Sequence, residues 1–517
     1  MKYDYIIVGA GSAGCVLANR LTENPNTNVL LLEAGKTDKK TEIEIPIAFS
    51  KLFKTEYDWS YYTEEQKELN NRRLFWPRGK VLGGSSSLNA NIYIRGHCED
   101  YNNWEKLGNK GWSYADLLPY FKKAENQEKG ASEYHGIGGP LNVKSRSYTN
   151  PLSHAFVVAG VAIGLPLCDD FNYPQPEGVG LYQVTIKNGK RHSAATAYLK
   201  PIINRSNLTI YTGALVTGLL FNGKRVIGVE YLRENIKQKA EITQEVILSA
   251  GAVNSPQLLM VSGIGNGSYL KNLGINVIVD LPGVGQNLQD HLVTGVIHEC
   301  IQPISLDKAD KIINLLQYLL FKKGPLTSNI GEAGGFVKTK TDLIAPDLQF
   351  HFAPAHFVNH GFTKFNGYGF SLGVTLIQPK SRGYLKINSK DALQPPIIQP
   401  NYLSEETDVQ VLVKGLKLAR KIANASPFDQ FRGEEILPGL GKDMIEYIRE
   451  KVESLYHPVG TCKMGQDSIS VVNSNLQVYG VEGLRVVDAS IMPKIVRGNT
   501  NAPTIAIAEK AADLLKQ

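Results

Sequence analysis

A glycine-rich turn between an apolar strand and a helix constrains this chain more than any other part of its sequence. The apolar run at residues 5–8 leads into Gly9-Ala-Gly-Ser-Ala-Gly14, a helical pattern covers residues 13–21, and a second apolar run at residues 29–32 ends at Glu33. This is the βαβ fingerprint of a dinucleotide-binding fold, with glycines that permit a tight turn, close approach to a pyrophosphate and close helix–strand packing. The pattern predicts a doubly wound α/β domain at the N-terminus.

The same fingerprint indicates how a nucleotide is held. The free N–H groups and the dipole of the helix that follows Gly11 favour a diphosphate. Glu33 follows Gly14 by about 20 positions, where an acid accepts hydrogen bonds from ribose hydroxyls, and this favours an adenosine without a 2′-phosphate. The fingerprint by itself does not distinguish NAD from FAD.

The composition is that of an ordinary globular protein. Charged residues make up 20% of the 517 residues and hydrophobic residues 43%, close to the globular average, and the length suggests roughly three domain-sized units. The net charge of +7 is spread over short, separated basic clusters, so nucleic acid is not an expected partner. The five cysteines form no C-x-x-C pair, which argues against a zinc site and a disulfide framework.

No targeting or membrane-spanning segment is expected. The N-terminus runs straight into an apolar strand that Gly9 interrupts, unlike a signal peptide, and no stretch approaches about 18 consecutive apolar residues. We therefore expect a soluble, cytoplasmic protein, with peripheral attachment to the inner face of the membrane left open.

Four further motifs follow the fingerprint in order. They lie at residues 79–91 (GKVLGGSSSLNAN), 251–265 (GAVNSPQLLMVSGIG), 456–465 (YHPVGTCKMG) and 486–504, which contains VVDASIMP and GNTNAPT. The first of them offers backbone N–H groups and hydroxyls to a polar ring or a phosphate. Taken alone, it is also readable as a turn-rich surface loop.

In this order, the motifs resemble those of the glucose–methanol–choline (GMC) family of FAD-dependent oxidoreductases, and the resemblance covers nearly the whole chain. Within the family, residues 332–336, 346–352 and 378–383 make the chain most similar to the branch of choline dehydrogenases and aliphatic alcohol dehydrogenases. The resemblance implies oxidation of a small-molecule alcohol by FAD. It leaves open whether oxygen, a quinone or another carrier reoxidises the flavin, and which oligomer forms.

The resemblance also implies an architecture of the α/β plus α+β class. A doubly wound FAD-binding domain is expected from residues 1–154, 193–302 and 452–517. A second, substrate-binding domain, built on an antiparallel sheet with helices, is expected from residues 155–192 and 303–451.

Two residues are expected to carry the chemistry. Oxidation of an alcohol removes a hydroxyl proton and a carbon-bound hydride, so the protein must supply a base beside the flavin. His457 matches the family's catalytic histidine, and a pKa near neutrality suits a base; the alternative is a histidine that merely packs in the core. Asn501 matches the second active-site position and is also a good N-cap for the helix that follows.

By the same resemblance, the motifs together are expected to bind FAD. The expected cofactor-binding residues are Gly9, Gly11, Ser12, Ala13, Gly14, Glu33, Ala34, Arg78, Gly79, Val81, Gly83, Gly84, Ser85, Asn89, Ala90, Asn91, Val216, Ala250, Gly251, Asp488, Ala489, Asn499, Asn501 and Thr504. Some family members attach the flavin through a histidine where this chain has Leu88. Leucine has no nucleophilic atom, so we expect non-covalent FAD.

Three residues are expected near the substrate: Glu332, His351 and Tyr456. Glu332 is either a carboxylate for a cationic substrate or a buried acid paired with backbone donors, and His351 is expected in the wall of the site. His351, His356 and His360 are closely spaced, but no acidic residue lies between them, so no metal site is expected.

The substrate expectation rests on residues 311–321, a strongly apolar helical pattern. If this helix lines the entrance, it favours an apolar primary alcohol of medium length; plain core packing is the alternative. Choline remains a second candidate substrate, because Glu332, Phe336, Phe350 and Tyr456 are residues that can cage a trimethylammonium group. A lyase or photodecarboxylase on the same fold, and a protein that only stores FAD, stay open as rival functions.

Overall fold

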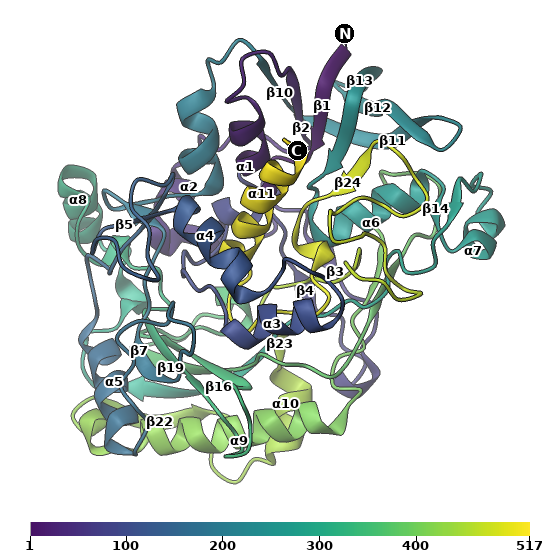
Figure 1. Ribbon diagram of the computed structural model, residues 1–517. Helices are drawn as coiled ribbons and strands as arrows, with labels where there is room; N and C mark the ends of the chain where they lie inside the picture. The colour runs from purple at the N-terminus through teal and green to yellow at the C-terminus, as the bar shows by residue number, and fades with distance from the viewer. Residues whose placement is uncertain (1, 517) are drawn as a thin grey trace.

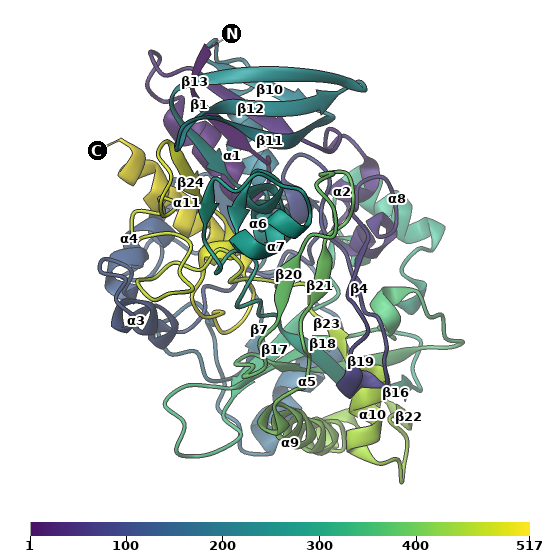
Figure 2. The same cartoon turned by 90° about the vertical axis from the view of Figure 1, so that its right-hand side faces the viewer.

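Two seven-stranded sheets organise the chain. The structure is a computed structural model that describes residues 2–516 (Figure 1). Seen from the side, the first sheet lies at the top of the molecule, and the second lies below it, above helices α5 (Pro151–Ala162) and α9 (Glu406–Ala423) (Figure 2). The doubly wound domain and the antiparallel sheet expected from the sequence are both confirmed.

The first sheet is parallel around its buried centre. Its order is β10-β2-β1-β13-β12-β11, with β24 beside β13. The parallel members are β1 (Lys2–Val8), β2 (Val29–Glu33), β10 (Leu208–Thr212), β13 (Ile236–Leu248) and β24 (Leu484–Val486). The antiparallel edge consists of β12 (Arg225–Arg233) and β11 (Ala214–Asn222). All five residues of β2 are buried, as expected for a parallel strand that is covered on both faces.

The two ends of the chain meet on this sheet. Helix α1 (Ser12–Leu21), which follows β1, packs against the C-terminal helix α11 (Asn501–Leu515) (Figure 1). A buried ion pair joins them, with Arg20 Nε 2.7 Å from Glu509 Oε2. Both helices therefore begin at the same place, above the carboxyl end of β1.

The second sheet is antiparallel throughout. Its order is β22-β16-β19-β18-β17-β7, with β23 beside β16. The strands are β22 (Arg432–Leu437), β16 (Leu292–Cys300), β19 (Gly369–Leu376), β18 (Leu348–Ala353), β17 (Ala333–Val337), β7 (Gly178–Leu181) and β23 (Glu453–Ser454). One face packs on α5 and α9, which leaves the other face toward the first sheet.

The strand pairing corrects one expected domain boundary. β16 lies within the segment 193–302 that was expected in the FAD-binding domain, yet it pairs with β19, β22 and β23 of the second sheet. The chain crosses into the second sheet at residue 292, about ten residues before the expected boundary at 302. β23 likewise contributes to the second sheet from the segment 452–517.

Short elements complete the fold. The remaining helices are α2 (Thr41–Glu44), α3 (Cys98–Lys106), α4 (Tyr114–Ala124), α6 (Gly251–Val261), α7 (Gly267–Asn272), α8 (Ile312–Phe321) and α10 (Met444–Lys451). The remaining strands are β3 (Tyr61–Tyr62), β4 (Phe75–Trp76), β5 (Glu125–Gln127), β6 (Leu141–Val143), β8 (Ile186–Lys187), β9 (Lys190–Arg191), β14 (Ile264–Gly265), β15 (Val279–Asp280), β20 (Tyr384–Lys386) and β21 (Ile397–Gln399). Within residues 2–516, no helix combines the length and the apolar character needed to cross a bilayer.

The apolar segment 311–321 forms the expected helix, α8. It neither lines the entrance to the site nor packs in the core, so both expectations for its apolar side chains are wrong. Tyr318 is the buried residue of this helix, and most of the other side chains face solvent. The helix does not pack in the core, and none of its residues lines the cavity described below. It projects from the side of the molecule (Figure 1).

Candidate active site

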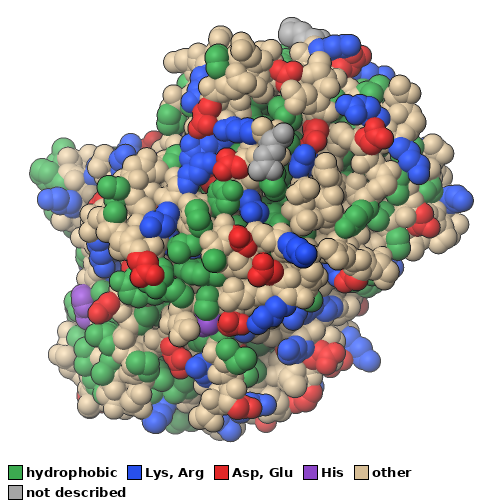
Figure 3. All heavy atoms as spheres, in the orientation of Figure 1, with side chains coloured by type: hydrophobic (Ala, Val, Ile, Leu, Met, Phe, Trp, Pro, Cys, Tyr) green, Lys and Arg blue, Asp and Glu red, His purple; other side chains and the backbone are tan. Residues whose placement is uncertain are grey.

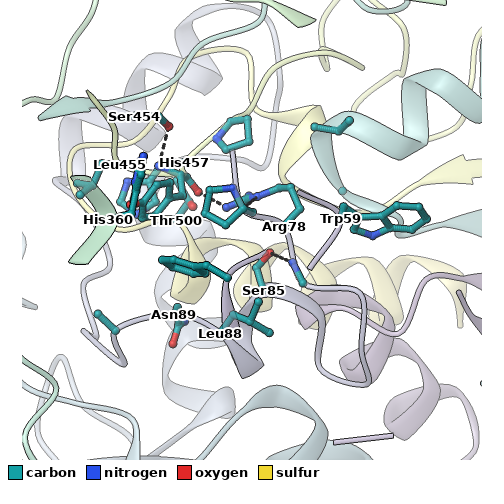
Figure 4. A pocket seen from close by; sticks show the side chains of 18 of the residues that line it. Trp59, Arg78, Ser85, Leu88, Asn89, His360, Ser454, Leu455, His457 and Thr500 are labelled. Carbon is teal, nitrogen blue, oxygen red and sulfur yellow. Dashed lines mark hydrogen bonds between the residues drawn. The ribbon is translucent and has the colours of Figure 1, made fainter. Parts of the chain in front are cut away.

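A cavity of about 870 Å³ lies between the two sheets. Its walls come from the carboxyl ends of β1 and β2, from the loop at residues 77–90, from the first residues of α1, α6 and α11, and from β16, β18 and β19 of the second sheet. Figure 4 shows His457 beside Thr500 at one end of the pocket, Trp59 at the other end, and Leu88 and Asn89 below them. The cavity thus joins every motif found in the sequence.

Two glycine loops meet at the nucleotide end. A Cβ on Gly14 would lie 1.9 Å from the carbonyl oxygen of Gly9, and a Cβ on Gly84 would lie 2.8 Å from the Cα of Gly11. Glycine is therefore required where α1 packs on its own turn and where the second loop touches the first. The contact brings Gly79, Gly84 and Ser85 next to the fingerprint.

Glu33 lies at the end of β2, on the cavity wall. Its Oε2 accepts a hydrogen bond from the Ala10 amide at 2.9 Å, and its Oε1 accepts one from the Gly35 amide at 2.8 Å. Burial raises the pKa of this carboxyl to about 7, against the opposing effect of the two amides. Each carboxylate oxygen retains a lone pair for a further donor.

Most of the predicted cofactor residues line the cavity. They are Gly9, Gly11, Ser12, Ala13, Glu33, Ala34, Arg78, Gly79, Gly84, Ser85, Asn89, Ala90, Val216, Ala250, Gly251, Asp488, Ala489, Asn499, Asn501 and Thr504. Four others, Gly14, Val81, Gly83 and Asn91, lie behind the loops instead. For example, the Gly83 amide donates to the Ala10 carbonyl at 2.7 Å, and Asn91 Oδ1 accepts from Arg191 Nη1 at 2.9 Å.

The residues present fit a dinucleotide such as FAD. The helices α1, α6 and α11 all begin on the cavity wall, and helix N-termini favour anionic groups. At Gly251, which lines the cavity, an added Cβ would meet no protein atom within 4 Å. The cavity is therefore open where the motif at residues 251–265 borders it.

Hydrogen bonds between two chain segments, residues 290–293 and 453–457, hold His457 in place. β23 pairs with β16, and the Leu455 amide donates to the His291 carbonyl at 2.8 Å. The main-chain N–H of His457 donates to Asp290 Oδ1 at 2.7 Å. Its ring Nδ1 lies 3.0 Å from Nδ1 of His291. Asp290 and His291, which the sequence analysis did not single out, therefore fix both the backbone and the ring.

Both imidazoles are neutral at physiological pH. Burial lowers the pKa of His457 well below its ordinary value, and His291, His351 and Arg78 lower it further. Burial likewise lowers the pKa of His291 to about 3. A neutral histidine at this position can accept a proton, which is what a base requires.

The neighbours of His457 indicate which ring nitrogen carries the proton and which carries the lone pair. Nδ2 of Asn499 lies 3.4 Å from His457 Nε2, and an amide nitrogen only donates. The lone pair is therefore on Nε2, at the cavity, and the Nδ1–H of His457 donates to His291 Nδ1. In this arrangement the ring is oriented from behind and its basic atom faces the cavity.

The expected role of Asn501 needs correction. Thr500 precedes the first residue of α11, and Asn501 is that first residue rather than its N-cap. Asn501 Oδ1 accepts a hydrogen bond from Ser12 Oγ at 2.7 Å and so ties α11 to α1. The amide next to His457 is that of Asn499, which was expected only to bind the cofactor. Both asparagines line the cavity.

Glu332 does not belong to the site. It is fully buried outside the cavity, where Oε2 accepts from the Asn150 amide at 2.8 Å and from Ser153 Oγ at 2.7 Å, and Oε1 accepts from Ser328 Oγ at 2.6 Å. Glu332 is therefore not a carboxylate for a cationic substrate. The alternative expectation, a buried acid with hydrogen-bond donors around it, is the one that the structure shows. Phe336 and Phe350 also lie away from the cavity wall, so the cage expected for choline does not form.

His351 and Tyr456 do line the cavity. His351 Nδ1 lies 3.0 Å from Thr375 Oγ1, while its Nε2 is buried without a partner among the described residues. Burial lowers the pKa of His351 to about 4. The Tyr456 hydroxyl pairs with His360. His356 pairs with Asp307 at 3.0 Å, so the three histidines at 351, 356 and 360 have separate partners.

An apolar wall that the sequence analysis missed lies beside these groups. Phe49, Phe53, Ile330 and Phe357 line the cavity, with the rings of Phe49 and Phe357 6.0 Å apart. Phe53 packs edge-on against Tyr456 at 5.8 Å. Phe49 belongs to the 3₁₀ helix η1 (Pro46–Leu52), and Phe53 follows it. None of the sequence motifs includes this segment, so its aromatic residues gave no signal of their position at the cavity.

Comparison with known proteins finds matches to one family over most of the chain. The N-terminal model of the GMC oxidoreductase family matches residues 3–293, and its C-terminal model matches residues 379–508. The chain is 48% identical to human mitochondrial choline dehydrogenase over 100% of its length and 90% of that protein's. It is 46% identical to an alcohol dehydrogenase (acceptor) of Pseudomonas putida, with 99% and 95% coverage.

Solved structures agree as well. Pyridoxine 4-oxidase from Mesorbium loti superimposes with a TM-score of 0.91 at 34% identity, covering 99% of both chains. A formate oxidase superimposes with a TM-score of 0.93 at 28% identity, covering 100% of this chain and 98% of its own.

The fold and the site define a dinucleotide-dependent oxidoreductase with a buried histidine at the junction of its two sheets. The chain belongs to the GMC oxidoreductase family, and its cofactor is FAD. The family, the fold class and the enzyme class expected from the motifs are confirmed.

Proposed function

We propose that the chain oxidises a primary alcohol to an aldehyde, with His457 as the general base. The observation that carries this proposal is the environment of His457, a neutral imidazole whose Nδ1 is paired with His291 and whose Nε2 lies at the cavity beside the Asn499 amide. The relatives named as alcohol and choline dehydrogenases support the same class of reaction.

The chain's own residues account for the movement of the proton. Nε2 of His457 accepts the proton of the substrate hydroxyl, and this leaves the oxygen able to expel a hydride from the neighbouring carbon. The charged imidazole keeps its Nδ1–H bonded to His291, so the ring holds its orientation. The substrate hydroxyl takes the place of the Asn499 N–H at Nε2, and the displaced amide then donates to the substrate oxygen. When bound, FAD supplies the acceptor for the hydride.

Residues at both ends of the cavity would hold the cofactor. Glu33 would accept hydrogen bonds from the ribose hydroxyls, and the N-terminus of α1 would hold the diphosphate. The N-terminus of α11, with Asn501 and Thr504 on the cavity wall, would stabilise negative charge on the flavin.

FAD is bound without a covalent link. Leu88, at the position that carries a histidine link in some relatives, lines the cavity and offers no nucleophile. Acid precipitation of the holoenzyme should release yellow flavin into the supernatant. Colour that stays in the washed pellet would contradict non-covalent binding.

The preferred substrate is an apolar primary alcohol of medium length. Support comes from Phe49, Phe53, Ile330 and Phe357 on the cavity wall, because each substrate methylene buried against such a wall contributes about 0.8 kcal/mol. Choline is the second candidate: choline dehydrogenases are among the most similar relatives, and the wall includes Tyr456 and Glu453. Glu453 is partly neutralised by Arg72, whose Nη2 lies 2.7 Å from its Oε1.

Steady-state kcat/KM values with ethanol, hexanol, benzyl alcohol, choline and glucose test this preference. We expect kcat/KM to rise from ethanol to hexanol and to be lowest for glucose, which needs many convergent polar groups. Turnover of choline well above that of hexanol would assign the site to choline instead. A lyase, or a protein that only stores FAD, would turn over none of the five.

A further inference from the structure

Helix α8 exposes an apolar face that nothing in the described chain covers. We define the α8 face as Ile312, Ile313, Leu316, Leu319, Leu320 and Phe321, with Ile312 76% exposed and Leu320 71% exposed. Hydrophobic side chains gather where the helix projects from the molecule (Figure 3). Single exposed apolar residues are ordinary, but a contiguous patch indicates a binding surface.

The helix is anchored from one side only. Tyr318 is buried in a small cluster with Leu306 and Leu326, against which Ile45 and Ile47 pack. A helix of this length is marginally stable in water by itself, so Tyr318 is what holds it against the body of the protein. The α8 face points away from this anchor.

Basic residues flank the α8 face at both ends of the helix. Lys311 precedes the helix, and Lys322 and Lys323 follow it. Beside the C-terminal end lies a second cavity of about 390 Å³, whose lining includes Lys187, Lys190, Arg191, Lys200 and Lys322 against two acidic residues, Asp38 and Glu44. The hairpin of β8 and β9 packs directly on the end of α8, since a Cβ on Gly189 would lie 2.3 Å from the Lys322 carbonyl oxygen.

Part of this basic cavity is already neutralised. Lys190 pairs with Glu44 at 2.8 Å and Lys200 with Asp38 at 3.1 Å. Among the described residues, Arg191 Nη2 is buried and has no hydrogen-bond partner. The net charge of the lining remains positive, so the cavity favours an anionic group.

We propose that α8 is the element by which the enzyme docks on an anionic phospholipid surface. The α8 face enters the boundary between headgroups and acyl chains, and the lysines at its ends and in the adjacent basic cavity bind the lipid phosphates. An apolar helical face bordered by lysines is the pattern of helices that lie in the membrane interface. Anionic lipids also complement the charge.

A second copy of the chain fits this surface less well. In a two-fold dimer the same patch meets itself, which brings the lysines of both copies together. The helix is about 15 Å long, so its face is far smaller than the roughly 800 Å² that each partner contributes to a stable interface. Binding to a bilayer does not require an interface of that area, because the lipids rearrange around the inserted helix.

The anchor of α8 also borders the active site. Ile45 and Ile47 pack near Tyr318, while Phe49 of the same segment lines the catalytic cavity. Docking would bring a membrane-dissolved apolar alcohol next to this segment. That consequence rests on the proposed function, whereas docking itself does not.

Flotation of the purified holoenzyme with vesicles tests the proposal. The vesicles contain phosphatidylcholine alone or phosphatidylcholine mixed with phosphatidylglycerol. We expect the enzyme to float with the mixed vesicles, and the variant Ile313→Ser/Leu316→Ser/Leu320→Ser to lose at least about tenfold in partitioning. The matched control Val158→Ser/Val161→Ser/Leu167→Ser removes three comparably exposed apolar side chains elsewhere and should float like the wild type.

A charge variant separates the contribution of the lysines from that of the apolar α8 face. Lys311→Gln/Lys322→Gln/Lys323→Gln should lose the preference for phosphatidylglycerol, by roughly fivefold for each lysine that contacts the surface. Hydrogen exchange of the wild type gives a readout without mutation: residues 312–321 should become protected when mixed vesicles are added.

Three results would overturn docking. They are a wild type that stays with the protein fraction, a triple serine variant that floats like the wild type, and a dimer that dissociates in that variant without vesicle binding. Flavin reduction by alcohol, measured on the same samples, keeps the two proposals apart. Its loss with flotation intact would count against the proposed function and not against docking.

Discussion

At the residue scale, the protonation state of His457 sets how the reaction responds to pH. Burial keeps its pKa well below the ordinary range, so the proposed base should stay neutral and active as the pH falls. The rate of flavin reduction should therefore be nearly constant between about pH 6 and 8, where an unperturbed histidine titrates. Stopped-flow reduction across this range measures it; a tenfold loss per pH unit below about 6.5 would show an unshifted base.

His291 is a positioning residue at the same scale. The His291→Phe variant keeps a buried ring but removes the acceptor for His457 Nδ1–H, which we expect to slow flavin reduction about tenfold, as for one lost hydrogen bond. His291→Asn retains an acceptor and should recover much of the rate. Substrate affinity should stay the same in both variants. Equal rates in the two variants would assign His291 a packing role only.

Single residues were predictable from sequence only where a motif contains them. Glu33 and His457 stand in motifs and lie on the cavity wall as expected. His291 was missed because its role depends on the pairing of β16 with β23, between segments more than 150 positions apart. Glu332 was misplaced because an isolated glutamate carries no sign of its partners, which are Asn150, Ser153 and Ser328.

At the scale of elements, the pair α1 and α11 holds the cofactor end together. Glu509 is fully buried and receives two hydrogen bonds from Arg20 and one from Tyr198. Arg20→Leu should destabilise the protein by about 3 kcal/mol, because it leaves a buried carboxylate without its main partner. The control is Arg225→Leu, whose partner Glu482 is exposed and which should cost less than about 1 kcal/mol. Chemical denaturation of the three proteins gives the comparison; equal losses would contradict this account.

Elements differ in how far sequence predicts them. The strand, turn and helix at the N-terminus formed as expected, since their glycines and apolar runs are local signals. The apolar pattern of α8 predicted a helix but not its environment, because periodicity does not distinguish the core from a surface that binds another partner. Asn501 was expected at the N-cap of α11, but the helix begins one residue earlier and Asn501 is its first residue. A difference of one residue is within the usual uncertainty of helix ends.

At the scale of the whole molecule, function depends on two sheets, and the chain contributes strands to one and then to the other more than once. The order of the motifs, through the family resemblance, was enough to predict both sheets. Spacing alone does not predict how β16 crosses from one to the other, and that crossing brings Asp290 and His291 to His457. The catalytic end of the cavity is thus a product of long-range pairing, while the nucleotide end is built largely from the local fingerprint.

Anaerobic reduction of the bound flavin by hexanol measures the proposed hydride transfer itself. We expect hexanol to bleach the wild-type holoenzyme, with one aldehyde formed per flavin. In His457→Ala the reduction should be slower by roughly 10²- to 10⁴-fold, the usual contribution of a positioned base, while FAD stays bound because the glycine loops hold it. A wild type that no alcohol bleaches, or a His457→Ala variant that is reduced at the wild-type rate, would contradict the proposed function.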